Sequence, residues 1–304
     1  YGDRIGGDFL TLQNAIEDFL IEQQIRGNSP NTVIYYKRCL GFFAIYIGDA
    51  TRPVEALSLS DCKGYYLYLK GQEITTTTIQ TYIRALRAFL TWCYTEGYLN
   101  ENIPERFKLP KAQRKTIDVL TDDELKRLFS CFDLRTFTGC RNYCICALML
   151  DSGLRLNEVV TLEPVRIHIP EGYLIVNGKG NKQRLVPIGL QSKKALLRYL
   201  SRLPPLPEQT TLFVTNDLTP LKLNAVKELF RKLKRRANIP RLKPHLLRHT
   251  FATRFLENGG DIYKLQEILG HTSLEMVKRY VHLIPSKLAV NFHSYSPLDN
   301  LMQR

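Results

Sequence analysis

The chain has 304 residues, of which 44% are hydrophobic and 24% charged, which is typical of a globular protein with about two domains. No apolar run reaches the roughly 18 residues that a membrane-spanning helix needs, and no secretory signal opens the sequence. Seven cysteines without a CxxC pair predict reduced thiols and a cytoplasmic protein. The chain begins at Tyr1 rather than Met, so we expect that a further N-terminal domain or tag can precede it.

The net charge of +14 is unevenly distributed. Residues 1–112 hold 12 Lys/Arg and 12 Asp/Glu, whereas the remaining residues hold 31 and 17. A basic second half indicates a polyanionic partner such as nucleic acid. The densest cluster spans 13 residues and contains Arg231, Lys232, Lys234, Arg235, Arg236, Arg241 and Lys243.

Residues 9–100 predict a helical domain without strands. Hydrophobic residues recur at helical spacing from Leu12 to Leu20, and Ser29-Pro30 marks the start of a second helix that runs to Ile47. Two more helices are expected at 57–69 and 75–94. The four threonines at 75–78 suit either contacts to a DNA backbone or a solvated helix cap, and the sequence does not choose between them.

The segment 101–118 contains Pro104 and Pro110 with little periodicity, and we interpret it as a linker. Thr121 and Glu124 then have the spacing of a capping box, which begins a second domain at 119–284. This domain is predicted to be mainly helical with one small three-stranded sheet at 166–169, 173–177 and 183–188. Further helices are expected at 191–203, 222–238, 244–258, 262–269 and 273–281.

The strongest chemical signal comes from His245 and Arg248, which lie on one helix face at spacing i,i+3. A guanidinium matches phosphate oxygens, and a tyrosine brought to that phosphate, such as Tyr280, is a potential covalent nucleophile. Arg155 follows a glycine near a helix N-terminus, where an anion is favoured. Glu158 is placed either to hold that guanidinium or to cap the helix. His249 is expected to be a packing or capping residue.

These residues stand in motifs that resemble the tyrosine recombinase (phage-integrase) family, which includes the Xer-type resolvases and mobile-element integrases. The motifs are Ser152-Gly-Leu-Arg155-Leu-Asn-Glu158, Gly178-Lys179-Gly-Asn-Lys-Gln-Arg-Leu-Val-Pro187, Pro244-His245-Leu-Leu-Arg248-His-Thr-Phe-Ala-Thr253, Leu269-Gly-His271-Thr-Ser and Tyr280-Val-His282. The resemblance implies an N-terminal SAM-like four-helix DNA clamp and an α-rich catalytic domain. It also implies a catalytic set of Arg155, Lys179, His245, Arg248, His271 and the nucleophile Tyr280, with Glu158 in support.

The same resemblance implies DNA strand cleavage through a 3′-phosphotyrosyl intermediate, without a metal or another cofactor. The implied partners are double-stranded DNA with specific recombination sites and three further copies of the chain, which together form a synaptic tetramer. The implied DNA intermediate is a Holliday junction. Residues 285–304 are expected to form a tail that docks on a neighbouring subunit. Expected DNA contacts are Lys37, Arg38, Arg84, Arg87, Lys182, Arg184, Arg231, Lys232, Lys234, Arg235, Arg241 and Lys243.

Three alternatives remain open from sequence. A type IB-like topoisomerase would use the same chemistry without strand exchange. A DNA-binding regulator would keep the fold and lose catalysis, although the six catalytic residues are all present. A metal-dependent nuclease would need clustered acidic ligands near the motifs. Integration, excision and resolution use the same active site, so the sequence does not distinguish these roles.

Overall fold

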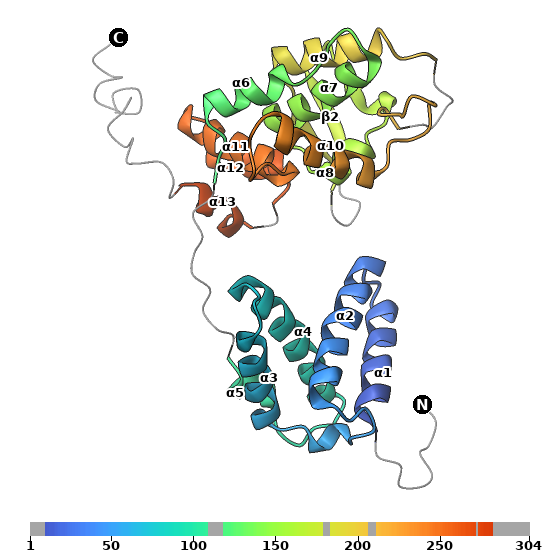
Figure 1. Ribbon diagram of the computed structural model, residues 1–304, viewed down its shortest axis with the longest axis vertical. Helices are drawn as coiled ribbons and strands as arrows, with labels where there is room; N and C mark the ends of the chain where they lie inside the picture. The colour runs from blue at the N-terminus through green and yellow to red at the C-terminus, as the bar shows by residue number, and fades with distance from the viewer. Residues whose placement is uncertain (1–9, 109–117, 179–182, 206–210, 272, 282–304) are drawn as a thin grey trace, which may run out of the picture. The chain divides into compact units, whose positions relative to one another are not determined.

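The computed structural model describes residues 10–108, 118–178, 183–205, 211–271 and 273–281. The chain divides into two compact units, residues 1–114 and 115–304, each with its own hydrophobic core (Figure 1). The fold class predicted from sequence is confirmed, because the described residues form a helical first unit and an α-rich second unit with one three-stranded antiparallel sheet.

The first unit consists of helices whose starts are set by hydroxyl caps. Thr11, Ser29 and Thr75 each accept a hydrogen bond from a backbone amide in the first turn of the helix that follows. Phe19, Phe43 and Phe89 are fully buried between the helices. The helices are α1 (Leu12–Ile25), α2 (Pro30–Ile47), α3 (Leu59–Gly71), α4 (Thr76–Thr95) and α5 (Ile103–Arg106), with a 3-10 turn at Val54–Ala56.

The threonine run at 75–78 acts as a helix cap. The Thr75 hydroxyl accepts from the Thr78 amide at 3.2 Å, which starts α4. Thr75, Thr77 and Thr78 line a hollow of about 450 Å³ between α2 and α4, together with Arg38. A contact to a DNA backbone at this place stays a prediction.

The interpretation of residues 101–118 as a linker is wrong for the first part of this segment, which contains α5. Pro104 lies in the first turn of α5, where a missing amide hydrogen costs nothing, instead of interrupting structure. Ile103 and Phe107 are buried in the core of the first unit. The expected linker residues 109–117 lie outside the described residues.

The predicted capping box near the start of the second unit is confirmed, because Thr121 and Glu124 form reciprocal capping hydrogen bonds. Its helices are α6 (Asp122–Ser130), α7 (Phe137–Asp151), α8 (Leu156–Val160), α9 (Leu190–Leu200), α10 (Leu223–Arg236), α11 (Pro244–Glu257), α12 (Ile262–Leu269) and α13 (Glu275–Val281). A 3-10 turn at Pro164–Arg166 leads into strands β1 (Ile167–His168), β2 (Tyr173–Asn177) and β3 (Gln183–Pro187).

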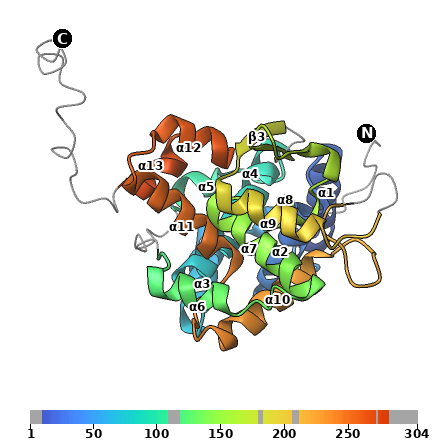
Figure 2. The same ribbon diagram turned by 90° about the horizontal axis from the view of Figure 1, so that it is seen from above.

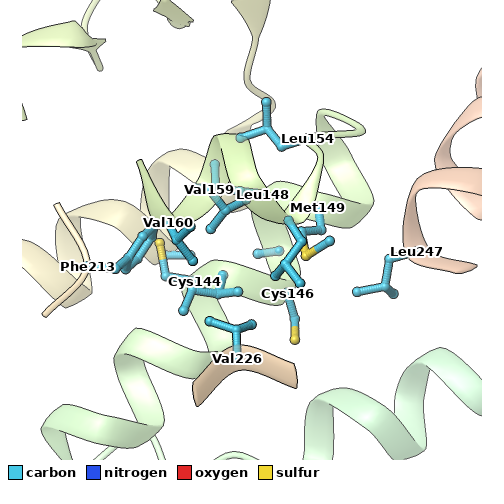
Figure 3. Packing of buried hydrophobic residues seen from close by; sticks show 14 of the residues in the cluster. Cys144, Cys146, Leu148, Met149, Leu154, Val159, Val160, Phe213, Val226 and Leu247 are labelled. Carbon is cyan, nitrogen blue, oxygen red and sulfur yellow. The ribbon is translucent and has the colours of Figure 1, made fainter. Parts of the chain in front are cut away.

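Helix α7 runs through the main core of this unit (Figure 3). Cys144, Cys146 and Leu148 are fully buried along it, and burial raises the pKa of both thiols. These cysteines therefore behave as small hydrophobic residues. Packing on both flanks fixes the C-terminal end of α7, where the Ser152 motif begins.

The sheet is antiparallel in the order β1-β2-β3. Val176 pairs with Arg184 and Leu174 pairs with Val186. Because side chains alternate across a strand, Arg184 lies on the same face as the buried Val186, and Leu185 faces solvent with 57% of its surface exposed. The sheet therefore directs an arginine toward the interior of the domain.

Helices α11, α12 and α13 lie together at one side of the second unit (Figures 1 and 2). Leu265, Leu269, Val277 and Tyr280 form a small separate core between them. This packing places the end of α13 against the helix that carries His245 and Arg248.

Candidate active site

The turn between α7 and α8 requires glycine at residue 153. Gly153 has φ of +61°, and a Cβ atom there would lie 2.4 Å from a ring carbon of Phe251. The tight turn directs the Gly153 carbonyl into the protein interior, where it accepts a hydrogen bond from Nη1 of Arg248. This hydrogen bond joins the motif that begins at Ser152 to the motif that begins at Pro244.

Arg248 is the buried centre of the site, with 5% of its side chain exposed. Its Nη2 donates to the Leu269 carbonyl at 2.7 Å and to Nε2 of His271 at 3.2 Å. Burial lowers the pKa of Arg248 to about 10, and the nearby charge of Arg155 acts in the same direction. The guanidinium stays protonated near neutral pH, held by backbone carbonyls that cannot themselves ionise.

Glu158 orients Arg155. One carboxylate oxygen accepts from Nη1 of Arg155 at 2.8 Å, and the other accepts from the Arg155 amide at 2.7 Å. Both functions that the sequence allowed for Glu158, holding the guanidinium and capping α8, are present. The Arg155 side chain keeps 32% of its surface exposed and can therefore reach an anion from solution.

Arg184 occupies the other side of the same carboxylate. Its Nη1 and Nη2 each donate to Glu158 at 2.8 Å, and its Nε donates to the Ile268 carbonyl at 2.7 Å. Burial raises the pKa of Glu158, but the two arginines outweigh that effect and hold the pKa at about 2. The expected DNA contact by Arg184 is wrong, because its side chain is only 11% exposed and its donors are directed into the protein.

The two histidines of the predicted set lie on either side of Arg248. His245 is one helical turn away on α11 and is exposed; partial desolvation and the charges of Arg248, Lys243 and Arg155 lower its pKa. His271 follows the left-handed Gly270 that ends α12. Because a guanidinium only donates, Nε2 of His271 accepts from Arg248, which places the proton of a neutral ring on Nδ1.

Tyr280 is buried, with 2% of its surface exposed, and its hydroxyl lies 2.8 Å from Nδ1 of His249. It is also near enough to Arg248 for its charge to affect the pKa of that guanidinium. His249 was expected to be a packing or capping residue; its ring does pack against the Tyr280 ring, with 5.7 Å between the centroids, but the prediction did not include its contact with the hydroxyl. The only sequence signal for its role is its place one residue after Arg248, on the α11 face that α13 covers.

The structure thus brings together Arg155, Glu158, Arg248 and His271. His245 lies one turn before Arg248 on α11, and Tyr280 lies on α13, which packs against α11. The expected catalytic residue Lys179 and the expected DNA contact Lys182 lie outside the described residues. So does the tail at 285–304.

Comparisons with known proteins identify the family. The Phage integrase family model matches residues 118–287, and the Phage integrase SAM-like domain model matches residues 11–109. The chain belongs to the phage integrase family. It is 32% identical to "Tyrosine recombinase XerD" of Oceanobacillus iheyensis, over 94% of this chain and 99% of the relative, and 30% identical to the protein of that name in Staphylococcus aureus, with the same coverage. The chain is a site-specific tyrosine recombinase.

Solved structures agree on the fold of this recombinase. The Tn1549 transposon integrase bound to a circular intermediate DNA matches with a TM-score of 0.74 at 20% identity, over 89% of this chain and 94% of that one. Lambda integrase bound to a core site matches with a TM-score of 0.71 at 18% identity, over 89% and 95%.

The basic residues expected to contact DNA differ in whether their donors are bound within the protein or exposed to solvent. Arg241 was expected to contact DNA; in this structure its donors bind Asp118, Glu124 and the Val119 carbonyl, and a DNA contact stays a prediction. Its cluster neighbour Arg231 is mostly exposed although it pairs with Glu228 at 2.5 Å. The remaining expected contacts in the described residues are exposed or half-buried: Lys37, Arg38, Arg84, Arg87, Lys232, Lys234, Arg235 and Lys243.

Within the described parts of the recombinase, no group of three or more His, Cys, Asp or Glu side chains is arranged to hold a metal ion. No described helix is long and apolar enough to cross a membrane.

Proposed function

We propose that this recombinase cleaves double-stranded DNA at specific sites through Tyr280 and rejoins the strands in a new arrangement. The observation that supports it is the convergence of Arg155, Arg248 and His271 around Glu158, next to a buried tyrosine on the adjoining helix. Three positively charged or hydrogen-bonding groups at one place suit a phosphodiester better than any neutral substrate.

In the proposed reaction the Tyr280 oxygen attacks the phosphorus atom and the bond to the 5′ oxygen breaks. The products are a 3′-phosphotyrosyl bond and a free 5′ hydroxyl. Negative charge grows on the non-bridging oxygens in the transition state, where Arg155 and Arg248 are already oriented by Glu158 and by backbone carbonyls. Such preorganised donors stabilise the transition state without reorganisation. His271 accepts from Nη2 of Arg248 and so helps to hold that guanidinium in place.

Two proton transfers complete the step. The leaving 5′ oxygen needs a proton, which we assign to Lys179 from the family resemblance. A phenol with a pKa of about 10 is un-ionised near neutrality, so Tyr280 must also lose a proton. Its hydrogen bond makes His249 a candidate acceptor beside His245, whose lowered pKa keeps it neutral and able to accept.

A second DNA 5′ hydroxyl can attack the phosphotyrosine and reverse the chemistry, so no nucleotide cofactor is needed. The arginines provide the positive charge that a divalent metal brings to other phosphoryl-transfer sites. Exchange between two duplexes requires four protomers, and we propose a homotetramer on DNA with a Holliday junction as intermediate. The solved structures of the Tn1549 transposon integrase and of lambda integrase, which share this fold, each contain bound DNA.

The decisive experiment traps the covalent intermediate on a nicked suicide substrate that carries a candidate recombination site. We expect a protein–DNA adduct in excess EDTA, linked through Tyr280, and no adduct with Tyr280→Phe although DNA binding persists. Adduct formation by Tyr280→Phe at the wild-type rate would overturn the assignment of the nucleophile.

Two alternatives predict different products. A type IB-like topoisomerase relaxes plasmids that lack any particular site, whereas the proposed recombinase needs its site. A catalytically silent regulator forms no adduct, whether the wild-type protein or Tyr280→Phe is used.

A further inference from the structure

We propose that Arg184 is a positioning residue that joins three motifs of the active site into one rigid phosphate-binding unit. The proposal rests on the proposed function, since the unit it stabilises is the one that would hold the scissile phosphate. Arg184 would act through Glu158 and the α12 C-terminus, without touching DNA.

The contacts of Arg184 span separate segments of the chain. From β3 it reaches the α8 residue Glu158 with both Nη atoms at 2.8 Å, and the Ile268 carbonyl on α12 with Nε at 2.7 Å. Glu158 in turn holds Arg155, and residue 268 lies three residues before His271. One side chain therefore connects the hairpin strand, the Arg155 turn and the His271 turn.

Gly270 gives independent support for this assignment. A Cβ atom at residue 270 would lie 3.0 Å from Cδ and 3.1 Å from Nε of Arg184, at a backbone φ of +61°. The turn before His271 is thus shaped both for a left-handed residue and for close passage of this guanidinium stem. Loss of Arg184 would leave the turn without the group against which it packs.

The electrostatic balance at Glu158 explains why one arginine is not sufficient. The carboxylate is buried, with 4% of its side chain exposed, and it ionises in the protein because Arg155 and Arg184 donate to it and Nη1 of Arg248 lies 4.0 Å away. Without Arg184, burial favours the neutral acid, and a neutral carboxyl group holds Arg155 less firmly. Arg155 would then be free to leave the geometry that the transition state requires.

The test compares Arg184→Gln with Arg166→Gln. Arg166 is a suitable control because it is also a partly exposed arginine beside the sheet, paired with Glu163 at 2.9 Å and bonded to Asn177. With saturating enzyme on the suicide substrate, we expect adduct formation about 100-fold slower in Arg184→Gln, as for a misplaced catalytic group. Site binding and its salt dependence should match wild type, and Arg166→Gln should cleave normally.

A double-variant cycle shows whether Arg184 acts through Glu158. Glu158→Gln and the double variant Glu158→Gln/Arg184→Gln should cleave at similar rates, because the second change removes a contact that is already lost. The double variant also avoids an unpaired buried carboxylate, which keeps the comparison usable if Arg184→Gln folds poorly. Additive losses would overturn the proposal. So would weaker DNA binding in Arg184→Gln with a salt slope reduced by about one, the signature of a direct phosphate contact.

A titration in the free protein separates this inference from the proposed function. Wild-type Glu158 should stay ionised down to a pH of about 2, whereas its pKa should rise in Arg184→Gln. A pKa of Glu158 unchanged by Arg184→Gln would overturn the positioning role even if the enzyme is active. Absence of any wild-type adduct together with a raised pKa would overturn the proposed reaction and leave the positioning network supported.

Discussion

Positive charge serves different purposes in two regions of the second unit. Around Glu158, Arg248 is buried and only 11% of the Arg184 side chain is exposed, and their donors bind a carboxylate, backbone carbonyls or His271. On α10, Lys232 and Arg235 are exposed to solvent. Each cation counts the same toward the net charge, but the exposed cations of α10 are the ones available to replace counterions along the DNA backbone, whereas Arg248 is oriented for the scissile phosphate.

This difference separates the rate of the reaction from affinity for DNA. A buried guanidinium whose geometry is fixed in advance stabilises the transition state, so its loss slows cleavage. An exposed lysine on a helix gains a phosphate contact only on binding, so its loss weakens the complex. Variants in the two regions should therefore change different measurements.

The largest effect in this comparison is expected for Arg248→Lys. A lysine keeps the charge but cannot reach the Gly153 carbonyl, the Leu269 carbonyl and His271 with separate donors. Adduct formation should be about 100- to 1000-fold slower, while DNA binding stays unchanged.

Arg254→Lys is the matched control, because Arg254 lies on the same helix and binds Asp122 and the Leu120 carbonyl away from the site. If both lysine variants slow cleavage equally, the effect of Arg248→Lys reflects the stability of α11 and not its place at the phosphate.

The fold was largely predictable because its signals are local. Caps at Ser29 and Thr121 mark helix starts, and alternation in β2 and β3 marks the hairpin. The error at α5 has the same origin: Pro104 was interpreted as a break, but its side chain and that of Ile103 are covered by the core of the first unit. Such burial depends on residues distant in sequence.

The site was predictable as a set of residues but not as a set of contacts. Arg184 was counted with the exposed cations, although strand alternation already placed it on the face of Val186. His249 could not be found from spacing, because its contact with Tyr280 depends on how α13 packs against α11. Long-range packing, not motif spacing, determines these roles.

The pH dependence of cleavage distinguishes the two histidines of α11. Desolvation and nearby positive charges lower the pKa of His245, so it is neutral at pH 7 and becomes protonated only as the pH falls through a value below 6.5. If His245 accepts the Tyr280 proton, the adduct rate should fall with pH across that lowered pKa. His245→Gln should then be about 100-fold slower near neutrality and lose this acid limb.

The variant His249→Gln tests the alternative, in which His249 and not His245 accepts the Tyr280 proton. Its hydrogen bond to the Tyr280 hydroxyl makes it the alternative acceptor. If the acid limb persists in His245→Gln and disappears in His249→Gln, the proton passes to His249 and the role assigned to His245 is wrong. Rates measured by adduct formation at saturating enzyme exclude any contribution from DNA binding.

The smallest effect is expected for the exposed face of α10. The double variant Lys232→Gln/Arg235→Gln removes two solvent-facing cations without disturbing a described ion pair. DNA affinity should fall, and the slope of log K against log salt should decrease by about two, since each phosphate contact contributes about one. Adduct formation at saturating protein should not change, because the described hydrogen bonds and ion pairs of Glu158 and Arg248 do not include either residue. Arg241→Gln is the comparison within the same basic cluster: its donors already bind Asp118 and Glu124, so it should leave the salt slope unaltered. A reduced slope in Arg241→Gln and an unaltered one in the double variant would reverse the assignment, and would mean that DNA displaces the internal ion pairs while α10 faces away from it.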